Sequence, residues 1–160
     1  MDEVRKQLIT ALTTSQAHGD FASIVADFPM DRINDKAPHS DYTAWRLLEH
    51  IRRTQKDILD FMVEPVYKER QWPKDYWPEE GVIADETMWH KTIDEYQEDM
   101  KNLIKLVEDK ATDLSSKVKN GDGQTIAREI IMVIDHNAYH LGEFSILRQV
   151  MGTWPKNHNK

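Results

Sequence analysis

Apolar residues recur three and four positions apart in four segments of the chain, which is the spacing of one face of an α-helix. These segments cover residues 2–18, 40–62, 85–119 and 124–152. The third is the most regular, and its seam consists of Trp89, Ile93, Tyr96, Met100, Leu103, Val107, Lys110 and Leu114. No segment alternates apolar and polar residues as a half-buried strand would. The pattern therefore predicts an all-α fold.

Signals for helix ends support these limits. Ser40 or Asp41 is suited to cap the N-terminus of the second helix, and Gly152, with Pro155 just beyond it, is suited to end the fourth. The sequence "NGDG", residues 120–123, predicts a tight link between the last two helices.

The two other connections are long. Residues 18–39 form the first, in which 21–28 could hold a short helix. Residues 64–84 form the second, whose two Trp-Pro pairs cannot continue a helix, so we expect this segment to fold over the end of the helices. Four helices with two long connections predict a four-helix bundle, a fold that builds metal sites from facing helices.

Composition narrows the choice of class and partner. The length of 160 residues favours a single domain, 1–160, with a sizeable core. The net charge of -7, with Lys and Arg scattered along the chain, argues against a nucleic-acid partner, because phosphate backbones select clustered positive charge. The absence of cysteine excludes disulfides and thiolate ligands. No apolar run is long enough for a signal peptide or a membrane span, so we expect a cytoplasmic protein.

The stretch "DHNAYHLGEF", residues 135–144, carries the most specific chemistry in the sequence. His136 and His140 are one helical turn apart, and on a helical wheel both lie on or beside the buried stripe, as does Glu143. Two such imidazoles can reach one metal ion, but they can also be neutral core histidines bonded to backbone carbonyls. Spacing alone leaves both interpretations open.

A third histidine would strengthen the metal interpretation. His50 lies at the edge of the apolar arc of the second helix, beside Leu47 and Thr54 and away from the charged side that holds Arg53 and Asp57. An edge position suits a ligand at a site open to solvent, and it equally suits a partly exposed histidine without a role. The wheel leaves His50 undecided.

Two segments together resemble the DinB-like superfamily, also described as DinB/YfiT-like metalloenzymes. They are "TAWRLLEHIRRTQKDILDF" and "REIIMVIDHNAYHLGEFSILRQVMGTW", and the likeness extends over residues 40 to 154. The connector motif "WPKDYWP" and the terminal pattern of Leu147, Arg148, Gly152 and Trp154 also look like family features. One departure is Glu143, which stands where many relatives carry Gln.

The resemblance implies a four-helix bundle that binds one divalent metal ion, most often zinc or nickel, through three histidines. His50, His136 and His140 stand in the three ligand positions. The relatives that the resemblance implies include metal-dependent hydrolases, and transferases or isomerases that use low-molecular-weight thiols such as bacillithiol or mycothiol. Because this chain has no cysteine, thiol transfer would need the thiol as a cosubstrate beside the small-molecule substrate. Glu143 could be a fourth ligand, hold a bound water, act as a catalytic base or be a rim residue.

A non-catalytic alternative also fits the sequence: a metal-binding, homodimeric stress protein that uses an apolar helix face as its interface. A weaker possibility, association with DNA, conflicts with the acidic charge.

Several further residues have candidate roles in the core, at a pocket or on the surface. Tyr42, Trp45, Tyr139 and the connector tryptophans could line a pocket or pack in the core, and Glu129 or Asn137 could orient a ligand. We expect His18, His39, His90 and His158 to be surface residues.

Overall fold

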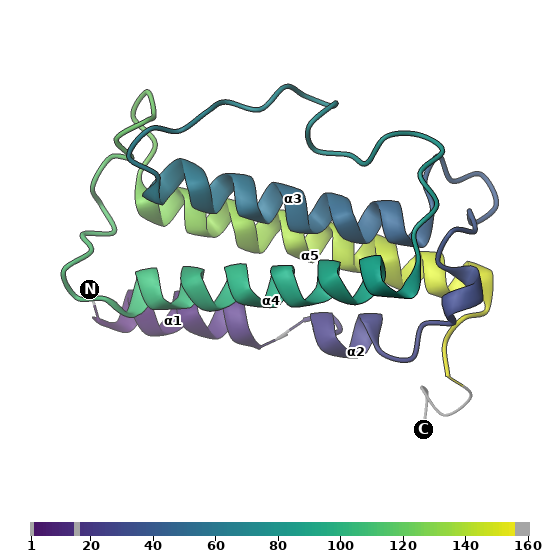
Figure 1. Cartoon of the computed structure of the whole chain (residues 1–160). Coiled ribbons are helices and arrows are strands. Elements are labelled where there is room, and N and C mark those ends of the chain that lie inside the picture. The colour runs from purple at the N-terminus through teal and green to yellow at the C-terminus, as the bar shows by residue number, and fades with distance from the viewer. Residues whose placement is uncertain (1, 15–16, 156–160) are drawn as a thin grey trace.

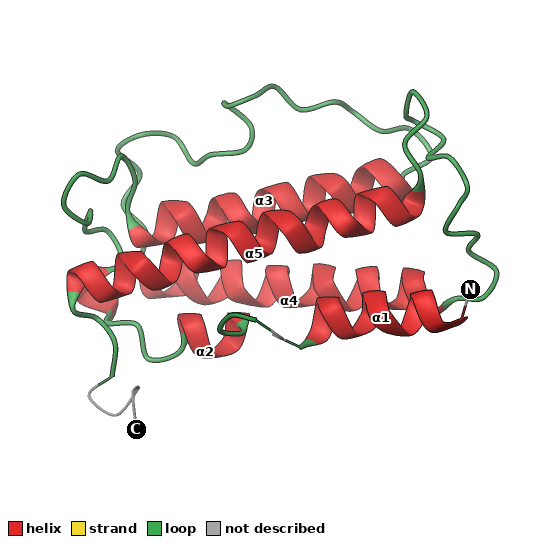
Figure 2. Cartoon of the chain, turned by 180° about the vertical axis from the view of Figure 1, so that it is seen from behind, coloured by secondary structure: helices red, strands yellow, loops and turns green. Residues whose placement is uncertain are grey.

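The computed structural model describes residues 2–14 and 17–155, in which all regular secondary structure is helical (Figure 2). Four helices are long: α1 (Asp2–Thr13), α3 (Ala44–Val63), α4 (Glu86–Glu108) and α5 (Ile126–Met151). Two are short: α2 (Phe21–Val25) and the 3₁₀ helix η1 (Met30–Arg32). The prediction of an all-α fold is thus confirmed, and α2 lies inside the segment predicted to hold a short helix.

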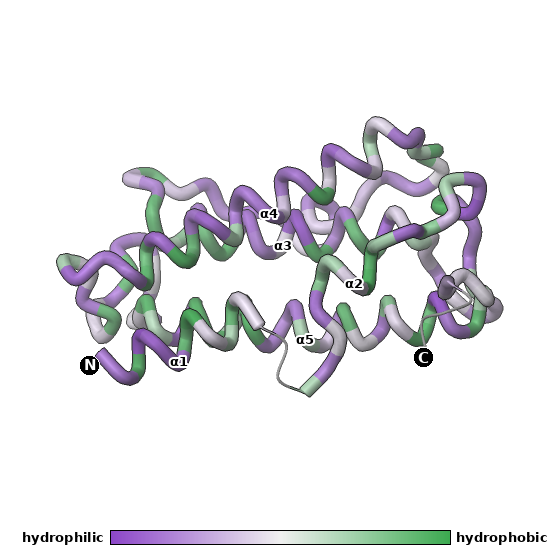
Figure 3. Tube along the Cα trace, turned by 90° about the horizontal axis from the view of Figure 1, so that it is seen from below, coloured by the Kyte–Doolittle hydropathy of each residue, from purple (hydrophilic) through white to green (hydrophobic). Residues whose placement is uncertain are grey.

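The four long helices pack in a closed ring. Helix α3 contacts both α4 and α5, and α1 contacts the same two helices from the other side. Figure 1 shows that α3 and α4 run in the same direction, whereas α1 and α5 run in the opposite one. Hydrophobic and hydrophilic residues are interspersed along these helices (Figure 3), as expected for helices with one buried face.

Threonine side chains cap the N-termini of α3 and α5, the two helices that carry the three clustered histidines. The Oγ1 atom of Thr43 accepts a hydrogen bond from the backbone N–H of Arg46 and so begins α3. Our prediction of Ser40 or Asp41 at this position was wrong, because the Ser40 hydroxyl bonds the backbone of Tyr42 instead. Gly152 ends α5 as predicted, in the left-handed conformation with φ 64°.

Helix α4 ends eleven residues earlier than the sequence pattern predicted, at Glu108 instead of Lys119. The side chains of Asp109 and Asp113 bond backbone N–H groups two residues further on, which favours turns over helix. Leu114 is nevertheless 1% exposed, because the loop returns it to the core. A buried loop leucine at helical spacing explains why the pattern predicted a longer helix. Because α4 ends early, the third connection is longer than the tight link we predicted.

The connection between α3 and α4, residues 64–85, does not fold over the end of the helices as expected. It runs back along the length of α3 (Figure 1), which the parallel direction of α3 and α4 requires. The aromatic part of this connector therefore lies beside the middle of α3, where His50 is located.

The terminal pattern of the sequence closes one end of the core. Arg148 is fully buried, and its guanidinium donates to the carbonyls of Ile24, Ala26 and Thr153 at 2.6–2.7 Å. The ring of Trp154 covers the same guanidinium, with 4.3 Å between Cζ and the ring centroid. Arg148 thereby joins the end of α2 to the end of α5.

None of the helices in the described part of the chain is long and apolar enough to span a bilayer.

Candidate metal centre

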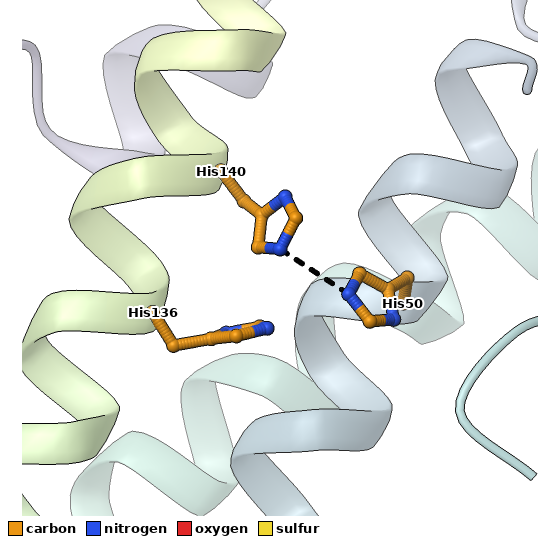
Figure 4. A group of neighbouring side chains, drawn as sticks. All are labelled: His50, His136 and His140. Atoms are coloured by element: carbon orange, nitrogen blue, oxygen red, sulfur yellow. Dashed lines mark hydrogen bonds between the residues drawn. The ribbon is translucent and has the colours of Figure 1, made fainter. Parts of the chain in front are cut away.

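Three histidines converge between α3 and α5 (Figure 4). His50 comes from the first half of α3, and His136 and His140 come from consecutive turns of α5. One ring nitrogen of each lies within 4.8 Å of the others, so the group could hold a metal ion. His50 is 2% exposed and the other two are partly buried. The structure thus brings together the three residues that the sequence left undecided.

The backbone of the connector fixes the ring of His50. Its Nδ1 atom lies 3.0 Å from the carbonyl oxygen of Tyr76. A carbonyl oxygen only accepts hydrogen bonds, so Nδ1 carries the proton and donates it. The lone pair of a neutral ring is then on Nε2, which faces α5.

Glu143 fixes the ring of His140 in the same way. The carboxylate oxygen Oε2 lies 2.8 Å from His140 Nδ1, which donates to it. This hydrogen bond leaves the lone pair of His140 on Nε2. Burial raises the pKa of Glu143. Glu143 contacts the ring on the side away from the ligand atom and is not among the grouped ligand atoms, so its role as a catalytic residue stays a prediction.

The two Nε2 atoms of His50 and His140 lie 3.2 Å apart. With both protons on Nδ1, this contact places two lone pairs face to face, which is repulsive unless a cation lies between them. Ligands at about 2.0–2.1 Å around a tetrahedral zinc ion are separated by roughly 3.3 Å. The observed separation therefore fits a shared divalent ion.

The ring of His136 completes the group less tightly. A ring nitrogen points toward the other two histidines (Figure 4). Its Nδ1 and the Oδ1 of Asn137 are both buried and neither makes a hydrogen bond, although Asn137 lies close enough to affect the pKa of His136. Asn137 is thus a candidate to orient this ring, and it is one of the two residues considered for that role from the sequence.

Burial and mutual proximity keep the three rings neutral. Burial is the main cause that lowers the pKa of His136 to about 4 and that of His140 to about 3, and the neighbouring histidines add to both effects. Burial also lowers the pKa of His50. Neutral imidazole is the form that binds metal ions, so the site is ready for a cation without losing protons.

Sequence reasoning missed a polar stripe on α3 that holds the connector over the site. Arg46 donates to the carbonyl of Pro78 and Arg53 to that of Trp77, on either side of the bond from His50 to Tyr76. Asp57 continues the stripe one turn further. The spacing i, i+4, i+7, i+11 is present in the sequence, but the helical wheel assigned the charged members to a side of the helix away from His50. The connector covers them.

The remaining candidates fall into packing and surface roles. Trp45 is 4% exposed and belongs to the core, whereas Tyr139 is 69% exposed beside His140. Glu129 accepts a hydrogen bond from the neighbouring Arg128. The surface histidines His18, His39 and His90 are exposed as expected, and His158 lies outside the described residues.

The sequence pattern of the DinB superfamily matches residues 2–144. The chain belongs to the DinB superfamily. The match includes α1 and ends one residue after Glu143, so all three clustered histidines lie within it. Searches of curated proteins and of solved structures found no match.

Proposed function

We propose that this DinB superfamily member is a metal-dependent enzyme with His50, His136 and His140 as the ligands of one divalent ion, zinc or nickel. In this proposal the ring of four long helices is a four-helix bundle of the DinB/YfiT-like type. The reaction is hydrolysis of a small molecule or transfer of a low-molecular-weight thiol onto it.

One observation carries the proposal: the 3.2 Å separation between the Nε2 atoms of His50 and His140. Each ring donates from Nδ1 to an oxygen acceptor, so neither Nε2 has a proton to share. A satisfied pair of core histidines would instead show one ring donating to the other. The cluster is a poor structural element without a cation and a good ligand set with one.

An ion with three neutral nitrogen ligands keeps a coordination position open and supplies Lewis-acid activation of the small molecule bound there. The protein residues orient and enclose this position. The Tyr76 carbonyl and the Glu143 carboxylate hold two of the rings, and Trp77 stacks on His50. The side chain of Glu143 is 31% exposed, and its raised pKa suits it to exchange a proton with a substrate beside His140.

The first test is metal content, measured by mass spectrometry on protein purified without an affinity tag. We expect about one divalent ion per wild-type chain, and loss of that ion in His50→Ala and in His136→Ala. The matched control is His90→Ala, since His90 is exposed on α4, pairs with Glu86 of the same helix and is not one of the three grouped histidines. If the wild-type protein neither carries nor takes up metal, the proposal of a metal-dependent enzyme is wrong. Uptake would justify screening thiols and esters as substrates.

A second candidate function has one observation in its favour. Apolar side chains are exposed along α5: Ile131, Tyr139, Ile146 and Val150. A second copy of the chain could cover them, which would suit a metal-binding homodimer without catalysis. Chelation would then lower the melting temperature of the protein without any turnover to lose.

A further inference from the structure

The connector is held against α3 by a small number of hydrogen bonds. A groove of about 1160 Å³ lies between it and helices α3 and α4, and Arg53, Asp57 and Trp77 are among the residues that line this groove. The apolar contacts of the connector are concentrated at a few residues, among them Trp77 and Val82, which pack against the core. Its placement over His50 also depends on individual polar contacts with the stripe on α3.

Asp57 is the centre of these contacts. It is 6% exposed, and the connector gives it two hydrogen bonds and one ion pair. The hydroxyl of Tyr67 donates at 2.9 Å and the hydroxyl of Tyr76 at 2.6 Å, and Nε of Arg70 forms the ion pair at 3.0 Å. A buried carboxylate with this many charge-assisted bonds is a strong anchor.

Tyr76 is held to α3 at two points. Its hydroxyl binds Asp57, and its backbone carbonyl accepts the proton on Nδ1 of His50. Asp57 and His50 are seven residues apart on one face of α3, a separation of roughly 10 Å along the helix axis. A tyrosine residue is long enough to span this gap.

We propose that Asp57 is a positioning residue for His50, acting through Tyr76 to hold the carbonyl that selects the metal-binding form of the ring. The ligand role of His50 rests on the function proposed above. A neutral histidine can carry its proton on either nitrogen, and only the form with the proton on Nδ1 presents a lone pair at Nε2. Loss of the anchor lets the Tyr76 carbonyl move away and both forms become populated, which weakens metal binding without removing a ligand.

The chain offers a matched pair of variants. Tyr76→Phe removes the hydroxyl that binds Asp57 and leaves the backbone carbonyl in place. Tyr67→Phe removes the other tyrosine hydroxyl on the same carboxylate, whereas the ring of His50 bonds the backbone of Tyr76 and not that of Tyr67. We expect Tyr76→Phe to weaken Co²⁺ binding about tenfold, within the range usual for residues that orient a ligand. Tyr67→Phe should change the affinity for Co²⁺ less than about threefold, which is the usual size of the effect of a surface substitution. The unfolding free energy should fall similarly in both.

A second measurement needs no metal. Nitrogen-15 NMR of the metal-free protein reports which ring nitrogen of His50 carries the proton. We expect Nδ1–H in the wild type and in Tyr67→Phe, and a mixture in Tyr76→Phe and Asp57→Asn. Equal losses of Co²⁺ affinity in the two tyrosine variants, or an unchanged ring in Tyr76→Phe, would overturn the proposal. A wild type that binds no Co²⁺ would overturn the proposed function instead, and the NMR result would still judge the role of Asp57.

Discussion

The indole of Trp77 lies parallel to the imidazole of His50, with ring centroids 3.9 Å apart and 3° between the planes. Trp72 contacts the same imidazole edge-on, with 6.2 Å between centroids. Both tryptophans come from the connector, so this segment encloses His50 with aromatic surface as well as with the Tyr76 carbonyl. The stack leaves the Nε2 edge of the ring facing α5.

This stack makes Trp77 a reporter of metal binding. Open-shell ions such as Ni²⁺ and Cu²⁺ quench indole fluorescence at short range, and Trp77 lies against a proposed ligand. We expect titration with Ni²⁺ to quench part of the tryptophan emission, and Trp77→Phe to remove the largest part of that quenching. Trp154→Phe is the control, because Trp154 packs on Arg148 near the end of α5. Equal quenching in wild type and Trp77→Phe would place the ion elsewhere.

Glu143 can be tested separately as a support for His140 and as a catalytic group. In Glu143→Gln the amide oxygen can still accept from His140 Nδ1, so we expect metal affinity to fall less than about tenfold. Glu143→Ala removes the acceptor and should weaken binding by about 10- to 100-fold. Competition with a chromophoric chelator measures both constants.

Exposed Glu98 on α4 supplies the control Glu98→Ala, for which no change is expected. If Glu143 also exchanges a proton with substrate, Glu143→Gln will retain the ion and lose turnover. An alanine variant that binds as tightly as the wild type would exclude the supporting role.

The sequence predicted the part of the candidate site on α5 better than the part on α3. His136 and His140 share a helix face by local geometry alone, and the wheel placed them correctly. His50 could not be placed, because its environment is made by the connector, which binds α3 through Tyr76 and Trp77. No periodicity predicts where a segment without regular structure will lie. The pairing of His50 with His140 depends on that long-range contact.

The fold shows the same division between local and long-range information. The existence of the long helices followed from apolar spacing, and so did the helix end at Gly152. The end of α4 was misplaced because Leu114 occupies a core position from a loop, which mimics another helical turn. The path of the connector along α3 was missed because helix direction is decided by packing.

Asp99 on α4 is a buried carboxyl group that should cost stability at neutral pH. It is 7% exposed, and burial raises its pKa to about 6, although Lys56 and Arg52 partly oppose the shift. The unfolded chain ionises this group near pH 3.9. The folded state therefore binds a proton more tightly, and the cost of ionising Asp99 appears between about pH 4 and 6 and stays constant above that.

Asp99→Asn removes this cost. We expect the variant to gain about 1–2 kcal/mol of unfolding free energy at pH 7.5, less than the roughly 2.7 kcal/mol that two pKa units represent. At pH 4 the gain should disappear. Urea unfolding at the two pH values measures it, with Asp94→Asn as a control because Asp94 is exposed on the same helix. A gain of equal size at both pH values would show that ionisation is not the cause.

The buried guanidinium of Arg148 should be intolerant of even a conservative change. It satisfies three backbone carbonyls with two nitrogens of a planar fork, and no water-exposed surface is left to replace those bonds. Lysine carries its donors on a single nitrogen, which cannot reach the end of α2 and Thr153 together. At least one buried carbonyl is left unpaired, so we expect Arg148→Lys to lower the unfolding free energy by about 2–3 kcal/mol.

Arg128→Lys is the matched control on the same helix, since the Arg128 side chain is 53% exposed and should tolerate the change within about 0.5 kcal/mol. Arg148 is eight residues beyond His140, roughly 12 Å along α5, so folded Arg148→Lys should keep its affinity for metal. Urea unfolding and a Co²⁺ titration distinguish the two effects. An Arg148→Lys protein as stable as the wild type would show that a single cation suffices at this end of the core. The fork geometry would then not explain why arginine stands there.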